Sequence, residues 1–167
     1  MGAHSGVRLG SLTWPVAVSV WASAGGRPRV LQPHRIGRPP YSPGLEAVLD
    51  HEVGLTGMGR LLDAGCWPGI LTVRLAPLFA EAVGLDPDAD MLAKGRRAAE
   101  ERGLSNARWA KALAEDLPEI APGPYRPVTF GQPFHWTDEQ RVAEKVHEVL
   151  EPGGAITLIV HSVAGRA

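Results

Sequence analysis

Acidic and glycine residues in the middle of the chain stand where a nucleotide-like ligand would need them. An apolar run ends at Asp63, and the turn-like segment Gly65–Gly69 (GCWPG) follows. A second apolar run ends at Asp86 and a third is followed by Asp116. Glycine lets a ligand approach the backbone closely, and a carboxylate can accept hydrogen bonds from two ribose hydroxyls or from an adenine amine. The spacing therefore predicts a pocket for an adenosine-containing ligand.

Strands and helices that would position these residues alternate along the chain. The expected strands cover residues 59–64, 81–86, 107–112, 127–134 and 155–163. The expected helices cover residues 45–53, 70–76, 89–102 and 137–150. This alternation predicts an α/β fold with a Rossmann-like, doubly wound, mostly parallel sheet of five strands. Ligands of such sheets bind at the carboxyl ends of the strands, so the three acids are expected at one edge.

Two of the expected helices carry clear start signals. Asp88 stands where its side chain can cap the helix over 89–102, whose charged residues are expected to form a solvated face. Thr137, followed three residues later by Gln140, has the pattern of a capping box for the last helix. Trp109, on the third expected strand, is expected to pack in the core or at the sheet edge.

Composition narrows the class of protein. The chain has 167 residues, which suits one domain, and its net charge of −1 gives no sign of a nucleic-acid partner. Cys66 is the single cysteine, so we expect no internal disulfide and a reducing, cytoplasmic location. The six histidines form no close pair with metal-ligand spacing, so no metal is expected. No apolar run reaches the length of about 18 residues that a membrane span needs, so no membrane partner is expected.

Residues 1–36 differ from the rest of the chain. They contain no acid and show no helix or strand period, so we expect an atypical, disordered segment before a core over 37–163 and a tail over 164–167. Three interpretations of this segment stay open. The apolar stretch that ends at residues 22–24 resembles an export signal with its cleavage site. The Arg/Pro/Gly-rich composition is also typical of a disordered arm, and its lack of acids fits an upstream stretch included by a misassigned start codon.

Five motifs, in order, resemble those of class I S-adenosylmethionine-dependent methyltransferases. They are LLDAGCWPG (61–69), VGLDPDADML (83–92), AEDLP (114–118), VTFGQPFHW (128–136) and LEPGGAITLIV (150–160). The segment GRPPYSP (37–43) resembles the entry segment of the same family, so the resemblance covers residues 37–163. It is closest to the small-molecule subgroup often labelled type 11. A generic Rossmann-like core that does not bind this cofactor is the alternative.

The resemblance implies S-adenosylmethionine as the cofactor and a small molecule as the methyl acceptor. The residues that it assigns to the cofactor lie in the first four motifs: Asp63, Gly65, Cys66, Gly69, Asp86, Met91, Glu115, Asp116 and Gln132. Asp63 is expected to order the loop through backbone amides or to hold the methionine ammonium. Cys66 is expected to be a small buried thiol rather than a nucleophile.

His135 is the candidate catalytic residue that the resemblance implies. It lies just past the fourth expected strand, at the rim where the family admits its methyl acceptor. There it could deprotonate an acceptor hydroxyl or carboxyl. A polar residue at the start of a helix is the alternative interpretation.

Trp67 departs from the family pattern, because it replaces the middle glycine of the first motif. A glycine at such a turn leaves space beside the ligand and can adopt positive φ, whereas an indole would fill that space. Three outcomes are open. The indole blocks the cofactor, the loop shifts and carries the indole outward, or the indole stacks on the cofactor through a cation–π contact.

The end of the chain is the second departure. The family continues after the fifth strand with a helix and two further strands, in the sheet order 3-2-1-4-5-7-6. Their lack would leave the strand over 155–163 as an open apolar edge, through which the chain would self-associate. A catalytically inactive, truncated methyltransferase-like protein is therefore the alternative to an active enzyme.

Overall fold

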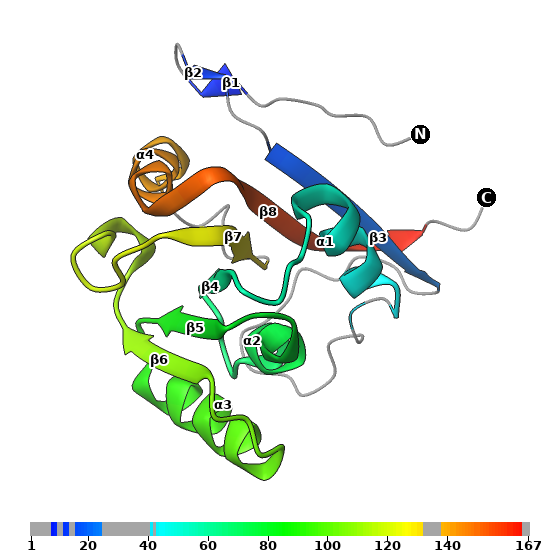
Figure 1. The fold of residues 1–167 in the computed structure, drawn as a ribbon, viewed down its shortest axis with the longest axis vertical. Helices are drawn as coiled ribbons and strands as arrows, with labels where there is room; N and C mark the ends of the chain where they lie inside the picture. The colour runs from blue at the N-terminus through cyan, green and yellow to red at the C-terminus, as the bar shows by residue number, and fades with distance from the viewer. Residues whose placement is uncertain are drawn as a thin grey trace.

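The computed structural model describes residue 41, residues 43–131 and 138–164, and three short N-terminal strands; side chains are described up to residue 159. The described chain forms a sheet of six strands in the order β3-β8-β7-β4-β5-β6, and every neighbouring pair is parallel. Figure 1 shows the sheet with helices on both faces. The predicted Rossmann-like α/β fold is confirmed.

The five strands expected from the sequence are all present. They are β4 (Arg60–Ala64), β5 (Glu81–Asp86), β6 (Ala107–Lys111), β7 (Tyr125–Phe130) and β8 (Leu150–Ala164). The helical elements between them are α1 (Leu45–Val53), α2 (Ile70–Leu75) with its 3₁₀ continuation η1 (Ala76–Leu78), α3 (Ala89–Glu101), η2 (Ala114–Asp116) and α4 (Glu139–Val149). The order β6-β5-β4-β7-β8 is the expected order 3-2-1-4-5.

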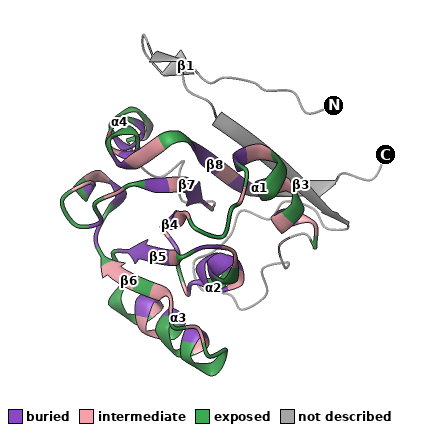
Figure 2. Cartoon of the chain, viewed as in Figure 1, coloured by how far each residue is buried: buried purple, intermediate pink, exposed green. Residues whose placement is uncertain are grey.

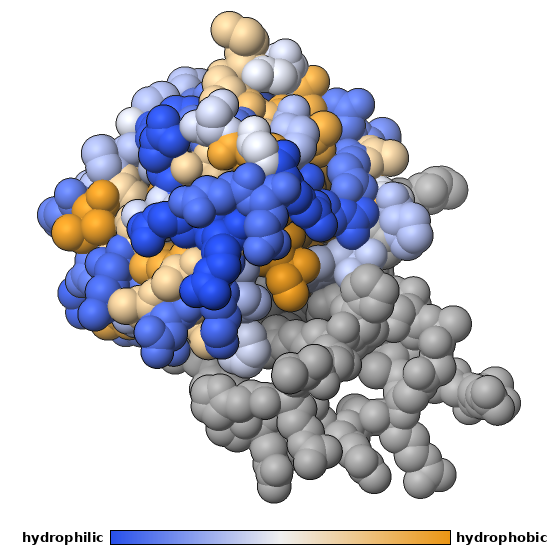
Figure 3. Space-filling view, turned by 90° about the horizontal axis from the view of Figure 1, so that it is seen from below, coloured by the Kyte–Doolittle hydropathy of each residue, from blue (hydrophilic) through white to orange (hydrophobic). Residues whose placement is uncertain are grey.

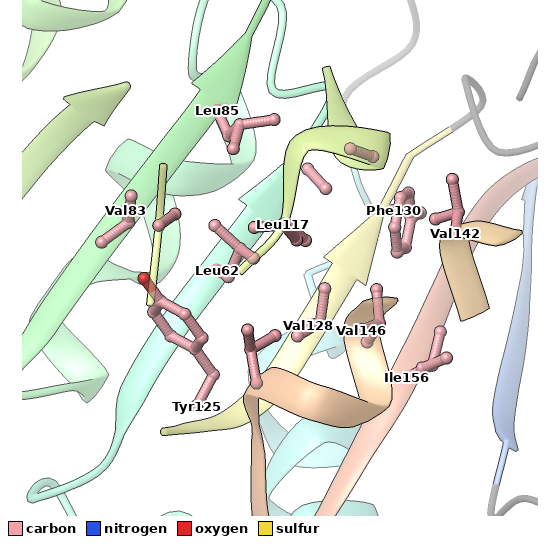
Figure 4. Close-up of a cluster of buried hydrophobic side chains, with 14 of the residues drawn as sticks. Leu62, Val83, Leu85, Leu117, Tyr125, Val128, Phe130, Val142, Val146 and Ile156 are labelled. Carbon is pink, nitrogen blue, oxygen red and sulfur yellow. The ribbon is translucent and has the colours of Figure 1, made fainter. Parts of the chain in front are cut away.

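Side chains of successive strand residues point to opposite faces, and this divides the core into two clusters. On the α4 face, Leu62 of β4 joins a cluster built from β5, β7, β8 and α4 (Figure 4). On the other face, Leu61 packs against α1 and α2. Figure 2 shows β4 and β5 as almost entirely buried between these layers. Asp63, two residues after Leu61, therefore points toward α2.

Helix α3 packs beside α2 over β5 and β6. Asp88 caps α3, since its Oδ1 accepts hydrogen bonds from the amides of Asp90 (2.8 Å) and Met91 (3.3 Å). The outer residues of α3 include the exposed Lys94 and Arg96. Figure 3, which views the molecule from the α3 side, shows a mostly hydrophilic surface there, as expected for a solvated face.

Two element boundaries differ from expectation. β7 begins at Tyr125, because this buried ring starts the strand and its residue pairs with Leu150 of β8. Helix α4 is capped by Asp138, whose Oδ1 accepts a hydrogen bond from the Arg141 amide at 3.2 Å. The expected capping box is therefore wrong: Gln140 instead donates to Glu144 one turn later, and Thr137 lies outside the described residues.

The N-terminal segment contains strands, contrary to the expectation that residues 1–36 show no strand period. β1 (Arg8–Leu9) and β2 (Leu12–Thr13) form an antiparallel pair. β3 (Val16–Ala24) runs parallel to β8, with Val16 opposite Ile156 and Ala24 opposite Ala164 (Figure 1). The expectation of an open edge at 155–163 is wrong for the same reason, because β3 covers this edge and satisfies its backbone groups.

We predict that breaking β3 makes the chain self-associate. Proline cannot donate to a ladder, and adjacent strand residues direct their amides to opposite sides, so Val18→Pro with Ser19→Pro removes one donor that faces β8. The uncovered apolar edge should raise the mass measured by light scattering at about 50 μM protein. The control, Val18→Ala with Ser19→Ala, keeps both amides and should behave like the parent. Equal masses for the proline and alanine variants would contradict the capping role of β3.

Candidate functional site

The loop between β4 and α2 lies at the carboxyl edge of the sheet and is tied to the next strand. Three of its residues have positive φ: Gly65 (67°), Trp67 (54°) and Gly69 (72°). The amides of Gly65 and Cys66 both donate to the carbonyl of Leu85 in β5, at 2.8 and 3.0 Å. The Gly69 amide closes the turn on the Cys66 carbonyl at 2.9 Å. Among these three residues with left-handed backbone, Trp67 is the one that is not glycine.

Asp86 ends β5, and its side chain binds the middle of this loop. Its Oδ2 accepts a hydrogen bond from the Trp67 amide at 2.9 Å, and its Oδ1 accepts one from the Asp88 amide at 2.9 Å. Only 3% of Asp86 is exposed, whereas 37% of Trp67 is exposed. The expected meeting of the loop with the acid of the second strand is therefore present. A ligand hydroxyl reaches this carboxylate only after the loop moves.

Asp63 has a different environment from the one expected. Its Oδ2 accepts a hydrogen bond from the Thr72 hydroxyl of α2 at 2.6 Å, and its Oδ1 accepts one from the Thr129 hydroxyl of β7 at 3.1 Å. Burial raises the pKa of Asp63 to about 6, against the lowering effect of these two hydroxyls. The carboxyl group therefore joins α2 to the sheet, and its side-chain partners are hydroxyls rather than the amides of Gly65–Gly69.

Cys66 is the small buried thiol that the sequence predicts. It is 6% exposed, and its Sγ lies 3.6 Å from the Trp67 carbonyl, to which the thiol donates. Burial raises the pKa of the Cys66 thiol, and the Asp63 and Asp86 carboxylates raise it further. Because the thiolate is the reactive form, this side chain packs under the loop and does not act as a nucleophile.

The remaining predicted site residues lie around the same edge. Asp116 is exposed, and its Oδ2 accepts a hydrogen bond from the Leu113 amide at 2.9 Å, which closes the η2 turn. Glu115 is half-buried in the same turn, and Met91 is half-buried in the first turn of α3. Gln132 and His135 lie outside the described residues.

Sequence reasoning missed three side chains that shape this edge. Thr72 and Thr129 hold the Asp63 carboxyl group, and their signal in the sequence is a hydroxyl residue flanked on both sides by apolar residues. Trp109 was assigned to packing, but its ring lies against Gly69 at the end of the loop. Within the described part of the chain, no group of three His, Cys, Asp or Glu side chains is placed to hold a metal ion. No helix among the described residues is long and apolar enough to cross a membrane.

Comparison with known proteins identifies the family of this chain. The profile of the family described as "Methyltransferase domain" matches residues 61–154, which include the loop, Asp63, Asp86 and Asp116. The chain belongs to the class I S-adenosylmethionine-dependent methyltransferase family.

Individual relatives differ in what they methylate. A probable S-adenosylmethionine-dependent methyltransferase of Saccharomyces cerevisiae is 33% identical over 95 residues, which is 56% of this chain and 33% of the relative. A tRNA 5-carboxymethoxyuridine methyltransferase of Escherichia coli is 28% identical over 64% of this chain and 41% of its own length. A ubiquinone biosynthesis O-methyltransferase of Acinetobacter baumannii is 28% identical over 65% of this chain and 46% of its own. The methyltransferase domain therefore spans less than half the length of each of these relatives.

Some of the similar solved structures are not named as methyltransferases. The 4+2 cyclase SpnF is 27% identical, with a TM-score of 0.60 over 68% of this chain and 43% of the cyclase. The likeness shows that the architecture is shared beyond methyl transfer, and that function has to be argued from the site.

We predict that Asp63 makes the methyltransferase domain less stable as the pH rises from about 4 to about 6. Its pKa in the folded chain, about 6, lies above the ordinary value of 3.8, so within this window the folded chain keeps a proton that the unfolded chain has lost. The free energy of unfolding should therefore fall across the window and level off above it. At 1.36 kcal/mol per pKa unit, the contribution is up to about 3 kcal/mol.

The measurement is urea unfolding at pH 4, 5, 6 and 7 for the parent and for Asp63→Asn. Asparagine does not titrate, so the stability of the variant relative to the parent should rise through this range. A difference between the two proteins that stays constant from pH 4 to pH 7 would show that Asp63 does not bind its proton more tightly in the folded state.

Proposed function

We propose that this methyltransferase domain binds S-adenosylmethionine between the Gly65–Gly69 loop and Asp86 and transfers its methyl group to a small molecule. The observation that carries the proposal is the hydrogen bond between the Trp67 amide and Asp86. It places the glycine loop of one strand against the acid of the next strand, at the edge where ligands of doubly wound sheets bind. Membership of the family supports the choice of cofactor.

Asp86 and the loop supply complementary groups for the adenosine part of the cofactor. In the proposal the Asp86 carboxylate accepts the ribose hydroxyls, and the glycine backbone at positions 65 and 69 lies against the methionine part. Asp116 is proposed to accept the adenine amine; its exposed carboxylate holds one local amide and has free lone pairs for a second donor. Glu115, Met91 and Gln132 complete the proposed pocket.

Methyl transfer needs positioning more than acid–base chemistry. When bound, S-adenosylmethionine supplies an electrophilic methyl group next to a positively charged sulfur. The domain then has to hold the acceptor atom in line and exclude water. His135 is proposed to remove a proton from an acceptor hydroxyl or carboxyl group, because it follows β7 in the sequence, within the fourth motif.

A small-molecule acceptor agrees best with the charge of this chain. A net charge of −1 offers no electrostatic attraction to a polyphosphate, although one relative is named as a tRNA methyltransferase. The ubiquinone-pathway relative is named for a small acceptor. After incubation of the protein with a cell extract and methyl-labelled cofactor, we expect the label in the small-molecule fraction. Label in the tRNA fraction would refute this acceptor class.

The single cysteine supports a cytoplasmic location.

A domain that does not catalyse methyl transfer is the second candidate. The burial of Asp86 beneath the loop favours it. The carboxylate is 3% exposed beneath the loop that carries Trp67, so the ribose hydroxyls reach it only when this loop moves. If this opening costs more than the cofactor contacts contribute, the domain remains unliganded. The two candidates differ in whether S-adenosylhomocysteine binds at all.

The first test is the affinity of Asp86→Ala for S-adenosylhomocysteine, measured by calorimetry. Loss of hydrogen bonds to a charged group should weaken binding by about 1–3 kcal/mol. The matched control is Asp88→Ala, which removes the cap of α3 two residues away and should lower stability with little change in affinity. Measurable binding by the parent that Asp86→Ala leaves unchanged would refute the assignment of the pocket.

The second test is Trp67→Gly, which addresses the departure from the family pattern. Glycine adopts the left-handed conformation of position 67 without strain and removes the indole from the loop that has to open. We predict at least about a tenfold gain in affinity for S-adenosylmethionine, equal to about 1.4 kcal/mol. Weaker binding by the variant would instead identify the indole as a group that contacts the cofactor.

A further inference from the structure

The indole of Trp109 fills a slot whose walls are glycines. A β-carbon added to Gly69, Gly84 or Gly95 would lie 2.4, 2.7 or 2.4 Å from a ring carbon of Trp109. Real β-carbons essentially never approach so closely, so each position accommodates the ring only because it lacks a side chain. The half-buried indole thus packs against three glycines, which is a specific arrangement and not loose packing.

Each glycine of this slot belongs to a different element. Gly69 ends the cofactor loop and is the residue before α2, Gly84 pairs with Trp109 across β5 and β6, and Gly95 lies inside α3. The ring therefore extends from the edge strand across β5 to the end of the loop. Cys66, also in the loop, reaches the same place, since its Sγ would lie 3.0 Å from a β-carbon on Gly84.

Gly95 has no local conformational reason to be glycine. It lies in the interior of a 13-residue helix and is not among the residues with positive φ. Alanine would favour the helix by about 1 kcal/mol at such a position. Glycine at this position leaves space for the Trp109 ring, and this is its structural reason. The packing of the ring therefore costs α3 the helix stability that alanine would give.

The ring constrains the loop at one end, and Asp86 constrains it at the middle. Gly69 cannot move toward β5, because the Trp109 ring occupies the space beneath it. The Gly69 amide is bonded to the Cys66 carbonyl, and the next amide along, that of Trp67, is bonded to Asp86. Displacement of the ring would therefore move the groups that are proposed to meet the cofactor.

We propose that Trp109 is a positioning residue for the cofactor loop: its ring, seated against Gly69, Gly84 and Gly95, holds the loop at the height at which the Trp67 amide meets Asp86. This inference rests on the proposed function for its consequence in cofactor binding. Its structural part, the hold of the ring on the loop, is testable without any ligand.

The sharpest variant is Gly95→Ala, which removes nothing and favours α3 but pushes the ring out of the slot. Hydrogen exchange of the amides at residues 65, 66, 67 and 69 should become about tenfold faster, as for a coupling between contacting residues. The matched control is Arg96→Ala, an exposed neighbour in the same helix, which should leave this exchange unchanged.

A second variant identifies the ring as the cause. Trp109→Leu should speed exchange of the loop amides on its own, and Gly95→Ala added to it should have no further effect, because the smaller side chain leaves room for the methyl group. Trp109→Phe, which keeps a flat ring, should retain most of the protection. Equal effects of Gly95→Ala in the presence and absence of Trp109 would overturn the proposal.

The binding experiment separates this inference from the proposed function. If the parent binds S-adenosylhomocysteine, Gly95→Ala should tighten binding at least about tenfold, because a loop held less firmly against Asp86 opens at a lower free-energy cost, and Trp109→Leu should make the addition of Gly95→Ala neutral. If the parent does not bind, the proposed function fails, and the exchange measurements still decide the role of Trp109. Faster exchange spread equally over α4 and the loop would indicate a general loss of stability and would overturn a specific positioning role.

Discussion

The hydrogen bond from the Trp67 amide to the Asp86 carboxylate is the constraint on which the carboxyl edge of this domain depends. It joins the loop after β4 to the end of β5 at 2.9 Å, and the second oxygen of the same carboxylate holds the amide of Asp88, the cap of α3. One buried charge therefore fixes the start of two helices relative to the sheet. A buried carboxyl group is stable only with such partners, so the loop conformation and the burial of Asp86 support each other.

A row of five aligned residues, three of them polar, crosses the sheet close to this edge. Thr157, Thr129, Asp63, Gly84 and Trp109 occupy one register position on β8, β7, β4, β5 and β6. Thr129 and Thr72 satisfy Asp63, whereas the Thr157 hydroxyl has no hydrogen-bond partner among the described groups. Aligned residues of parallel strands share a face, so this row brings polar groups into the layer beneath the helices. Burial in this layer disfavours the charged form of a carboxyl group, and for this reason Asp63 keeps its proton to a higher pH than an exposed aspartate.

The fold could be predicted because each of its cues is local. Alternating apolar runs and caps such as Asp88 identify elements, and the parallel crossover rule then places Asp63, Asp86 and Asp116 at one edge. The partners of Asp63 and the slot around Trp109 could not be predicted, because they depend on register between strands far apart in the chain. The pairing of β3 with β8 was missed for a different reason. The parallel partner of an edge strand is not marked by periodicity in a segment rich in small residues.

Trp67 shows how this loop balances strain against hydrogen bonding. A non-glycine residue with φ of 54° carries a cost of about 1–3 kcal/mol. A hydrogen bond to a buried charge contributes about 1.5–3 kcal/mol, so the bond to Asp86 offsets the strain while the loop is closed. The donor is the backbone amide, so a glycine at the same position would keep this bond and carry no strain. What the indole adds is its bulk in the loop, which has to move when the proposed cofactor reaches Asp86. The residue that departs from the family pattern thus shifts the equilibrium of the loop, and it does so without changing the fold that surrounds it.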